Sequence, residues 1–301
     1  MSRTPSQAPA SVPAAPALPA VGDLLRLTKP RITALVTFTA VAAAVAAGAG
    51  SAAVVVHLAA GTLLLSGGTN TLNQWLEREA DARMRRTRER PLPAGRVRSG
   101  QAAAWGTALV GSGAAWLAAG TNTTTALLGL AAAALYVAVY TPMKRRSPIS
   151  LLVGAVPGAL PALGGWVAVT GTASGTGLAL FGVLFLWQLP HFLALGWLLR
   201  DDYRRAGFSV LAVEDPDGVL SGRSAVLSAA GLLPVSLAPW WAGAASPWFA
   251  AAAGAVGAAY LAGSVVFARE GTEGAARRLF LASLVYLPAV LGALALDARW
   301  L

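Results

Sequence analysis

Apolar residues run along most of the chain in segments of similar length, separated by short polar stretches. Nine such segments extend over 32–49, 53–72, 101–119, 123–141, 150–170, 177–199, 224–244, 248–268 and 278–296. A helix needs about 20 apolar residues to cross the hydrocarbon core of a bilayer. Each segment is close to that length, so the pattern predicts an all-α, polytopic membrane protein with nine transmembrane helices.

The fifth segment, 150–170, is the least regular of the nine. Two prolines, Pro157 and Pro161, and several glycines interrupt it. Such interruptions are tolerated where a span lines a cavity or packs closely against its neighbours. We therefore expect the small residues of this segment to allow close helix packing or to widen a pocket, namely Gly154, Gly158, Gly164 and Gly165.

Composition supports the membrane prediction. The 301 residues are 56% hydrophobic and 12% charged, with a mean hydropathy of +0.60, whereas a soluble domain carries about 25% charged residues. The net charge of +10 would suit a nucleic-acid-binding protein, but the basic residues cluster at the ends of apolar segments. The chain has no cysteine, which excludes disulfides, thiolate nucleophiles and thiolate metal sites.

The charged residues also predict an orientation, because Lys and Arg concentrate on the cytoplasmic side of membrane proteins. With the N-terminus in the cytoplasm, nine spans place 73–100, 142–149, 200–223 and 269–277 on that side. Of the 23 Lys and Arg residues, 22 lie there or at its edge, and Arg299 is the exception. Only Asp297 of the 13 acidic residues lies opposite. We expect a bacterial cytoplasmic membrane protein whose polar site faces the cytoplasm.

Residues 1–23 differ from the rest of the chain. They are rich in Ala, Pro and Ser, and prolines disfavour a helix. The stretch also lacks an apolar core long enough for a signal peptide. We expect a disordered cytoplasmic tail, followed by a single membrane-embedded domain over 24–301.

The most charged stretch, 73–92, follows the second apolar segment directly. Asn73, Glu77 and Asp81 are spaced at i, i+4 and i+8, so on a helix they lie roughly on one face. Their oxygen atoms suit a hard cation such as Mg2+, which often shares its ligands with substrate phosphates. Five arginines, whose guanidinium groups match phosphate well, follow at once: Arg83, Arg85, Arg86, Arg88 and Arg90. The alternative is a solvated collar of charges beside a span.

Two further polar stretches lie at the same predicted side. Lys144, Arg145 and Arg146 could bind phosphate or could simply anchor a span. His191 lies inside the sixth apolar segment, where an ionisable residue is a functional candidate; the alternative is a histidine bonded to a backbone carbonyl. Asp201 and Asp202 follow, about 15 Å from His191 along a continuous helix. Two acidic clusters on two helices would suit two Mg2+ ions bridging one diphosphate.

These stretches resemble the UbiA superfamily of membrane prenyltransferases over roughly residues 24–296. The first contains the family's N-x-x-x-D/E-x-x-x-D and M-x-R-T-x-x-R-P patterns, here Asn73, Glu77, Asp81, Met84, Arg86, Thr87, Arg90 and Pro91. The second resembles Y-T-x-x-K-R with a downstream G-A-x-P and G-W. The third is similar to P-H-F-x-x-L and D-Y-x-x-A-G of the haem-farnesylating branch, here Pro190, His191, Phe192, Leu195, Asp202, Tyr203, Ala206 and Gly207.

The resemblance implies a UbiA-type helical bundle around a central cavity, in which farnesyl diphosphate and haem B meet. It implies Mg2+ as cofactor, held by Asn73, Glu77, Asp81, Asp201 and Asp202. It implies catalytic roles for Asn73, Glu77, Asp81 and His191. The substrate-binding residues that it implies are Arg86, Arg90, Tyr140, Lys144, Arg145, Trp187 and Tyr203.

The resemblance also implies further partners: the lipid bilayer and, downstream, a haem A synthase or assembly factors of a terminal oxidase. Aromatic faces such as Tyr140, Trp166 and Trp187 would stabilise an allylic cation, or they simply pack. His191 would contact the haem or handle a proton. Two other functions stay open. One is a UbiA-type enzyme that prenylates an aromatic or quinone precursor, and the other is a transporter for an anionic lipid or metabolite.

Overall fold

The computed structural model describes residues 18–49 and 51–297, and every regular element in these residues is helical. The predicted tail therefore lies mostly outside the described residues, as does Arg299, and the first helix begins at Val21. In chain order the elements are α1 (Val21–Leu27), α2 (Pro30–Ala46), α3 (Ala52–Arg83), α4 (Ser99–Gly120), α5 (Thr123–Ala134), the π-helix η1 (Leu135–Tyr140), α6 (Thr141–Met143), α7 (Ser150–Thr170), α8 (Gly175–Leu198), α9 (Arg200–Ala206), α10 (Leu211–Glu214), α11 (Val219–Trp241), α12 (Pro247–Glu270) and α13 (Glu273–Asp297).

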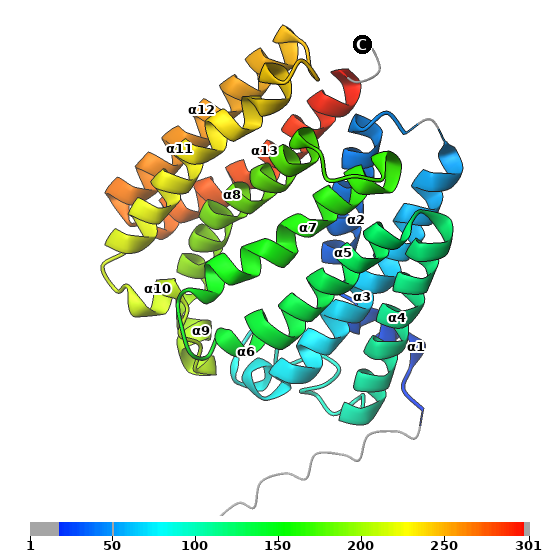
Figure 1. Ribbon diagram of the computed structural model, residues 1–301. Coiled ribbons are helices and arrows are strands. Elements are labelled where there is room, and N and C mark those ends of the chain that lie inside the picture. Colours follow the sequence, from blue (N-terminus) through cyan, green and yellow to red (C-terminus); the bar gives the residue numbers. More distant parts are fainter. Residues whose placement is uncertain (1–17, 50, 298–301) are drawn as a thin grey trace, which may run out of the picture.

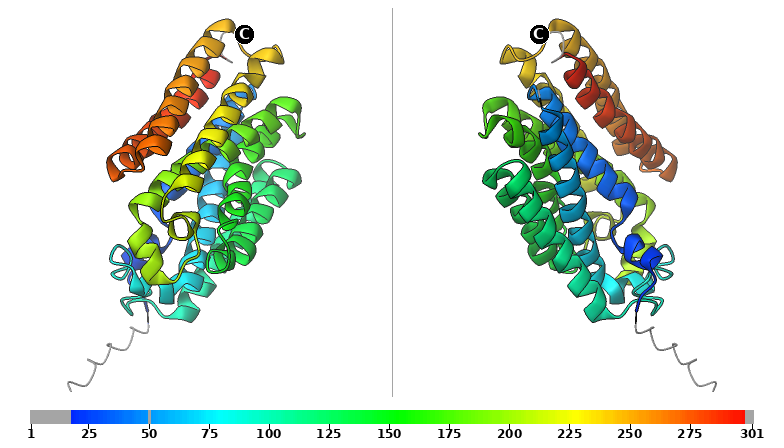
Figure 2. Two further views of the ribbon diagram at one scale, coloured as in Figure 1. Left: turned by 90° about the vertical axis from the view of Figure 1, so that its left-hand side faces the viewer. Right: turned by 90° about the vertical axis from the view of Figure 1, so that its right-hand side faces the viewer.

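The predicted all-α polytopic fold is confirmed. Within the described residues, eight helices are long and apolar enough to cross a membrane, and the bent pair of α1 and α2 makes up to nine. Each of the nine predicted segments coincides with one of these helices. The long helices lie side by side and slanted in one bundle (Figures 1 and 2). Large apolar side chains such as Leu127, Leu227 and Val285 are exposed on its outside, as expected for a surface that faces lipid.

The bend between α1 and α2 is 52° and falls at Thr28 and Lys29. Lys29 has a left-handed backbone, with φ of 49°, which is uncommon for a residue with a Cβ atom. Pro30 then begins α2, where its missing N–H costs no helical hydrogen bond. This local geometry turns the chain into the bundle and places the Lys29 side chain at one end of it.

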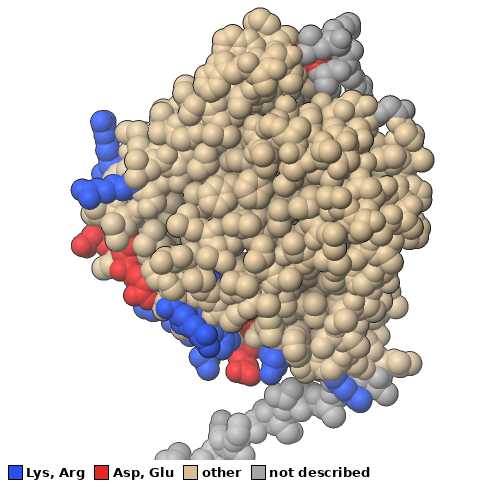
Figure 3. Space-filling model, viewed as in Figure 1, with Lys and Arg blue, Asp and Glu red and all other residues tan. Residues whose placement is uncertain are grey.

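Charged side chains gather at that end. In Figure 3, Lys and Arg lie with Asp and Glu along the lower left edge of the molecule, and most of the remaining visible surface is uncharged. The end of α3 lies with α6 and α9 at the same end in Figure 1, and the end of α13 lies at the opposite end. The folded chain therefore concentrates on one end the charges that the sequence distributes over four separate segments.

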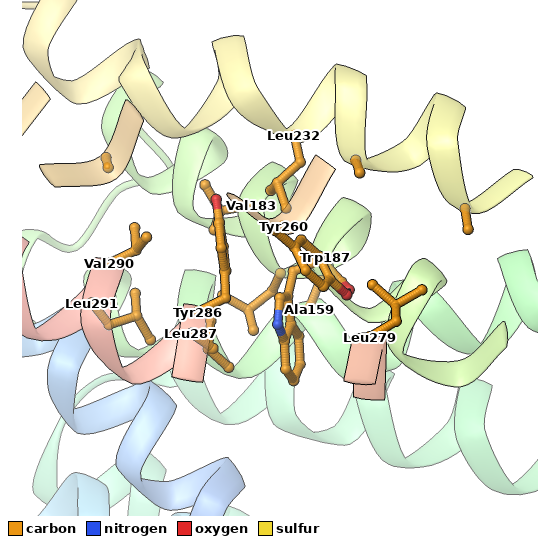
Figure 4. Packing of buried hydrophobic residues seen from close by; sticks show 14 of the residues in the cluster. Ala159, Val183, Trp187, Leu232, Tyr260, Leu279, Tyr286, Leu287, Val290 and Leu291 are labelled. Carbon is orange, nitrogen blue, oxygen red and sulfur yellow. The ribbon is translucent and has the colours of Figure 1, made fainter. Parts of the chain in front are cut away.

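The largest buried cluster lies where α8, α11, α12 and α13 meet. Trp187, Tyr260 and Tyr286 come together there with Leu232, Leu279 and other aliphatic residues (Figure 4). The polar atoms of these rings are bonded: Trp187 Nε1 donates to the carbonyl of Ser283 at 2.8 Å, and the Tyr260 hydroxyl donates to the carbonyl of Trp187 at 3.1 Å. Aromatic packing with satisfied polar tips holds α8 and α13 in a defined register.

The glycines of α7 allow the close packing that the sequence predicts. A Cβ atom at Gly165 would lie 1.9 Å from the carbonyl oxygen of Ala40 on α2, so α2 and α7 approach backbone to backbone. A Cβ atom at Gly154 would lie 2.5 Å from the ring of Tyr140. Because neither position has room for a methyl group, these two glycines set how close α7 lies to α2 and η1.

Two local departures from the predicted helices matter for the site. The fourth span contains the π-helix η1, a form that is often found at functional sites. The continuous helix expected from His191 to Asp201 is wrong. Helix α8 ends at Leu198, and Leu199, with φ of −112° and ψ of 12°, leaves the helical conformation. Asp201 and Asp202 consequently belong to the separate short helix α9.

Candidate functional site

A large apolar cavity of about 730 Å³ occupies the middle of the bundle. Residues of α2, α3, α5, η1, α7, α8 and α13 line it. The four α7 glycines singled out in the sequence all contribute to its wall, because they carry no side chain that would fill it. Tyr140 and Trp187 line the cavity too, together with His191, Phe192 and Phe280.

The polar face of α3 lies buried at the charged end of the bundle. Asn73, Glu77 and Asp81 are 1%, 6% and 1% exposed. A solvated collar would leave such side chains in water, so the collar interpretation is wrong for these three residues. Burying carboxylates is costly unless they are paired, and the structure supplies a cationic side chain for each member of this row.

The three cationic partners come from distant parts of the chain. Lys29 Nζ donates to Asn73 Oδ1 at 2.8 Å, Lys144 pairs with Glu77, and Arg90 Nη1 donates to Asp81 Oδ2 at 2.8 Å. Asn73 Nδ2 also donates to the Thr141 hydroxyl at 3.0 Å. Carboxylates and cations thus alternate around one buried face, an arrangement that suits a ligand carrying both negative charge and a metal ion.

Lys144 is the most embedded of these cations. Its Nζ lies 4.9 Å from the ring centroid of Tyr140 and 5.3 Å from that of Phe208. Burial by itself would lower the pKa of Lys144, but the adjoining Glu77 carboxylate outweighs it and the pKa is raised. The side chain therefore stays cationic at neutral pH, which suits contact with an anionic group.

The second acidic cluster is divided between the site and the surface. Asp202 Oδ1 accepts from the backbone N–H of Arg85 at 3.3 Å, which brings α9 against the end of α3. Burial favours a higher pKa for Asp202, but hydrogen bonds from Arg205 and from Arg85 prevail, so the pKa of this carboxyl is lowered. Asp201 is instead 71% exposed and pairs with Arg204 at 2.8 Å.

The other substrate-binding residues that the sequence predicted lie in two places, a small pocket and the exposed surface of the charged end. Tyr203 stacks edge-on against Phe208, with ring centroids 5.9 Å apart, and lines a small pocket with Tyr140 and Lys144. Arg86 and Arg145 are exposed at the charged end. Their predicted contacts with a substrate, and the metal-binding role of Asp201 and Asp202, stay predictions.

His191 lies deeper, in the wall of the apolar cavity. Its Nδ1 is 2.7 Å from the Ser283 hydroxyl on α13. Its ring stacks against Trp187 and packs against the tilted ring of Phe280, with centroids 5.1 and 4.9 Å away. The hydrogen-bond partner of this histidine is therefore a side-chain hydroxyl and not the backbone carbonyl that the sequence left open.

Three residues of the site were not singled out in the sequence as part of it. Lys29 belongs to no motif, and its uncommon backbone conformation becomes visible only in the structure. Gln188 donates to the carbonyl of Ala155 at 2.8 Å, and its Oε1 lies where a side chain on Gly158 would be. Ser283 carries no motif of its own. A polar residue within an apolar span is the one signal that points to Gln188 and Ser283.

The α3 face fits a divalent cation in one specific respect. Asp81 Oδ1 is buried and has no hydrogen-bond partner, so one hard oxygen ligand is available there. Across residues 18–49 and 51–297, however, no three His, Cys, Asp or Glu side chains form a group that would hold a metal alone. A Mg2+ ion at this face would therefore take oxygen ligands from a bound phosphate as well, as Mg2+ commonly does.

Comparison with known proteins decides the family. The model of the UbiA prenyltransferase family matches residues 34–287. The chain belongs to this family. A protein from Anaeromyxobacter sp. (strain Fw109-5), named protoheme IX farnesyltransferase, is 47% identical over 280 residues, which cover 92% of this chain and 94% of that protein. The protoheme IX farnesyltransferase of Myxococcus xanthus (strain DK1622) is 42% identical over 289 residues, covering 94% and 97%.

Solved structures of UbiA family members share the fold. A UbiA homologue from Aeropyrum pernix K1 superposes with a TM-score of 0.69 at 21% identity, covering 90% of this chain and 99% of that chain. A UbiA homologue from Archaeoglobus fulgidus bound to GPP and Mg2+ gives 0.64 at 16% identity, covering 91% and 99%. The predicted UbiA-type bundle is thereby confirmed, and the chain is a multi-pass membrane prenyltransferase.

Proposed function

We propose that this UbiA family member transfers the farnesyl group of farnesyl diphosphate to a vinyl group of haem B, giving haem O and diphosphate, with Mg2+ as cofactor. The observation that carries the proposal is the combination of two neighbouring features. A buried row of oxygen ligands and cations stands at the charged end of the bundle, and a large apolar cavity is lined by His191. Tyr140 joins the two, because it lines the cavity and its ring centroid lies 4.9 Å from Lys144 Nζ. The two relatives described above bear the name of this activity.

The diphosphate would bind at the buried α3 face. Lys144 and Arg90, which pair with Glu77 and Asp81, are placed to contact its oxygens, with Arg86 and Arg145 at the surface as further donors. Asn73, Glu77 and Asp81 would hold Mg2+, joined by Asp202 and Asp201. When bound, Mg2+ neutralises the diphosphate and so makes it a better leaving group.

The farnesyl chain would occupy the apolar cavity below. When the C–O bond breaks, its electron pair leaves with the diphosphate and an allylic cation remains. Tyr140 and Trp187 present ring faces in the cavity wall, and aromatic faces stabilise cations. The vinyl π electrons of haem B then form the new C–C bond, and a water molecule adds to the resulting cation with loss of a proton.

The membrane setting of the reaction follows from the charges. We place the N-terminus and the diphosphate site at the cytoplasmic face of a bacterial cytoplasmic membrane, because the Lys and Arg residues of the described chain gather at that end of the bundle (Figure 3). A downstream haem A synthase, or assembly factors of a terminal oxidase, would receive the product.

The test is conversion by purified protein in detergent or nanodiscs. With Mg2+, farnesyl diphosphate and haem B, we expect haem O and equimolar diphosphate, and neither without Mg2+. The His191→Ala variant should lose haem conversion more than farnesyl diphosphate binding. If haem B is unchanged while a hydroxybenzoate or naphthoate is prenylated, the acceptor is wrong and only family membership stands. If no diphosphate is released with any acceptor, prenyl transfer itself is wrong.

A further inference from the structure

The hydrogen bonds around His191 carry an inference about the acceptor, and it rests on the proposed function. We propose that His191 Nε2 is an axial ligand to the iron of the bound haem, and that Ser283 is the positioning residue that presents this nitrogen. The argument begins at the Ser283 hydroxyl, which has a single proton and three neighbours. These neighbours are the carbonyl oxygen of Phe280, three residues earlier on α13, the hydroxyl of Tyr260 on α12, and His191 Nδ1 at 2.7 Å.

These contacts favour one position for the hydrogen of the neutral imidazole. The carbonyl oxygen of Phe280 only accepts, and the Tyr260 hydroxyl already donates to the carbonyl of Trp187, so either oxygen can take the Ser283 proton. The Ser283 oxygen then accepts from His191, in the tautomer whose hydrogen sits on Nδ1. Nε2 is left with an unshared electron pair. This is the state of an imidazole that binds a metal through Nε2, with its other nitrogen held by a hydrogen bond.

The free nitrogen also has space in front of it. No protein group of the described residues bonds to Nε2, and His191 lines the 730 Å³ cavity. The ring cannot turn freely, because it stacks against Trp187 and packs against the tilted ring of Phe280. Trp187 is itself fixed by its bond to the Ser283 carbonyl at 2.8 Å. Ser283 thus secures the imidazole twice, through its hydroxyl and through Trp187.

The chemistry of the acceptor matches this nitrogen. Haem iron is commonly held by a histidine, and apart from its two propionates the macrocycle is a large apolar surface that suits the cavity wall. A vinyl group has no atom that the protein can hold by a hydrogen bond. Iron ligation supplies a fixed point that the vinyl group lacks, because it sets the distance and the tilt of the porphyrin plane relative to the cavity wall. A proton-transfer role would not need the iron.

The test exploits the small number of histidines. The chain has two, His57 and His191, so a histidine–iron signal has only two possible sources. The protein should be purified with a tag that lacks histidine, labelled with 15N-histidine and loaded with haem B without farnesyl diphosphate. We expect the Soret band and the resonance Raman iron–nitrogen band of a histidine complex, with the Raman band shifted by 15N.

Matched variants assign the signal. His57 stacks against Trp116 at 5.7 Å and does not line the cavity, so His57→Gln should keep the signal. His191→Ala should lose it, and added imidazole should restore the spectrum. Ser283→Ala should keep the fold but shift the iron–nitrogen band and weaken haem binding about tenfold or more. The control is Ser264, an equally buried serine that bonds only to the carbonyl of Tyr260. Ser264→Ala should change neither the iron–nitrogen band nor the affinity for haem.

The outcomes separate this inference from the proposed function. If wild-type protein binds haem B and makes haem O but shows no 15N-sensitive band, the ligation is wrong and the function stands. A band that persists in His191→Ala overturns the inference equally. If Ser283→Ala matches Ser264→Ala, Ser283 has no positioning role. If wild-type protein neither binds nor converts haem B, the proposed function fails and this inference fails with it.

Discussion

At the scale of single residues, the site is defined by the partner of each buried polar group. Asp81 is 1% exposed, and one of its two oxygens is taken by Arg90 while the other has no partner. Arg90 is itself only partly buried. An anion that binds Arg90, together with a cation that binds Asp81, would replace this ion pair with charge-assisted contacts of the same kind. The ion pair thus compensates the buried charge of Asp81.

Asp81→Asn tests this role, because it keeps the shape of the side chain and removes its charge. We expect prenyl transfer to fall at least about tenfold, equivalent to about 1.4 kcal/mol of transition-state stabilisation. Turnover should be measured over a range of Mg2+ concentrations, and the apparent Mg2+ requirement should rise. Glu79 lies on the same helix but is 67% exposed, so Glu79→Gln serves as control with normal turnover. Unchanged turnover of Asp81→Asn at limiting Mg2+ would remove Asp81 from the site.

At the scale of elements, α7 decides the shape of the cavity. Its glycines have different surroundings although they are adjacent in sequence. Gly165 meets the backbone of α2, while a Cβ atom at Gly164 would have no atom within 4 Å. Both line the cavity. One glycine therefore serves helix packing, and its neighbour leaves space in the pocket.

The pair Gly165→Ala and Gly164→Ala separates these two roles. The new methyl group at position 165 would overlap the Ala40 carbonyl, and backbone shifts of this kind cost about 1–3 kcal/mol of folding free energy. Gly164→Ala should leave stability unchanged or slightly raised, because alanine favours a helix over glycine. Thermal unfolding of both variants in one detergent measures the difference. Equal unfolding temperatures would mean that α2 and α7 are not in backbone contact.

At the scale of the whole molecule, the two ends of the bundle differ in charge. The charged end contains the buried row of Asn73, Glu77 and Asp81, and the long sides of the helices expose apolar residues. An odd number of crossings follows if the bent pair of α1 and α2 spans the membrane once, and α1 and the end of α13 then lie on opposite sides.

Reporter fusions check this orientation. Fusions after residues 95, 146, 215 and 273 should all report the cytoplasm, and a fusion at residue 301 should report the other side. The physical reason is the retention of Lys and Arg on the cytoplasmic side during insertion. A cytoplasmic reporter at residue 301 would contradict nine crossings. The first helix pair would then be suspected, because its bend of 52° makes it the least regular span.

The sequence by itself determined what depends on residue type and local spacing. Segment length and hydropathy predicted the eight long apolar helices and the bent pair of the described residues, because crossing a bilayer requires a helix of about 20 apolar residues. The i, i+4, i+8 spacing placed Asn73, Glu77 and Asp81 on one face, since helical periodicity is a local property. The same motifs led to the UbiA family.

Only the tertiary structure decided which groups meet. Lys29 reaches Asn73 across 44 positions of sequence, and His191 reaches Ser283 across 92. No local pattern encodes such pairs, because they depend on how helices pack and on breaks such as those at Lys29 and Leu199. Those packing contacts bury the carboxylates beside their cations and present one nitrogen of His191 to the cavity.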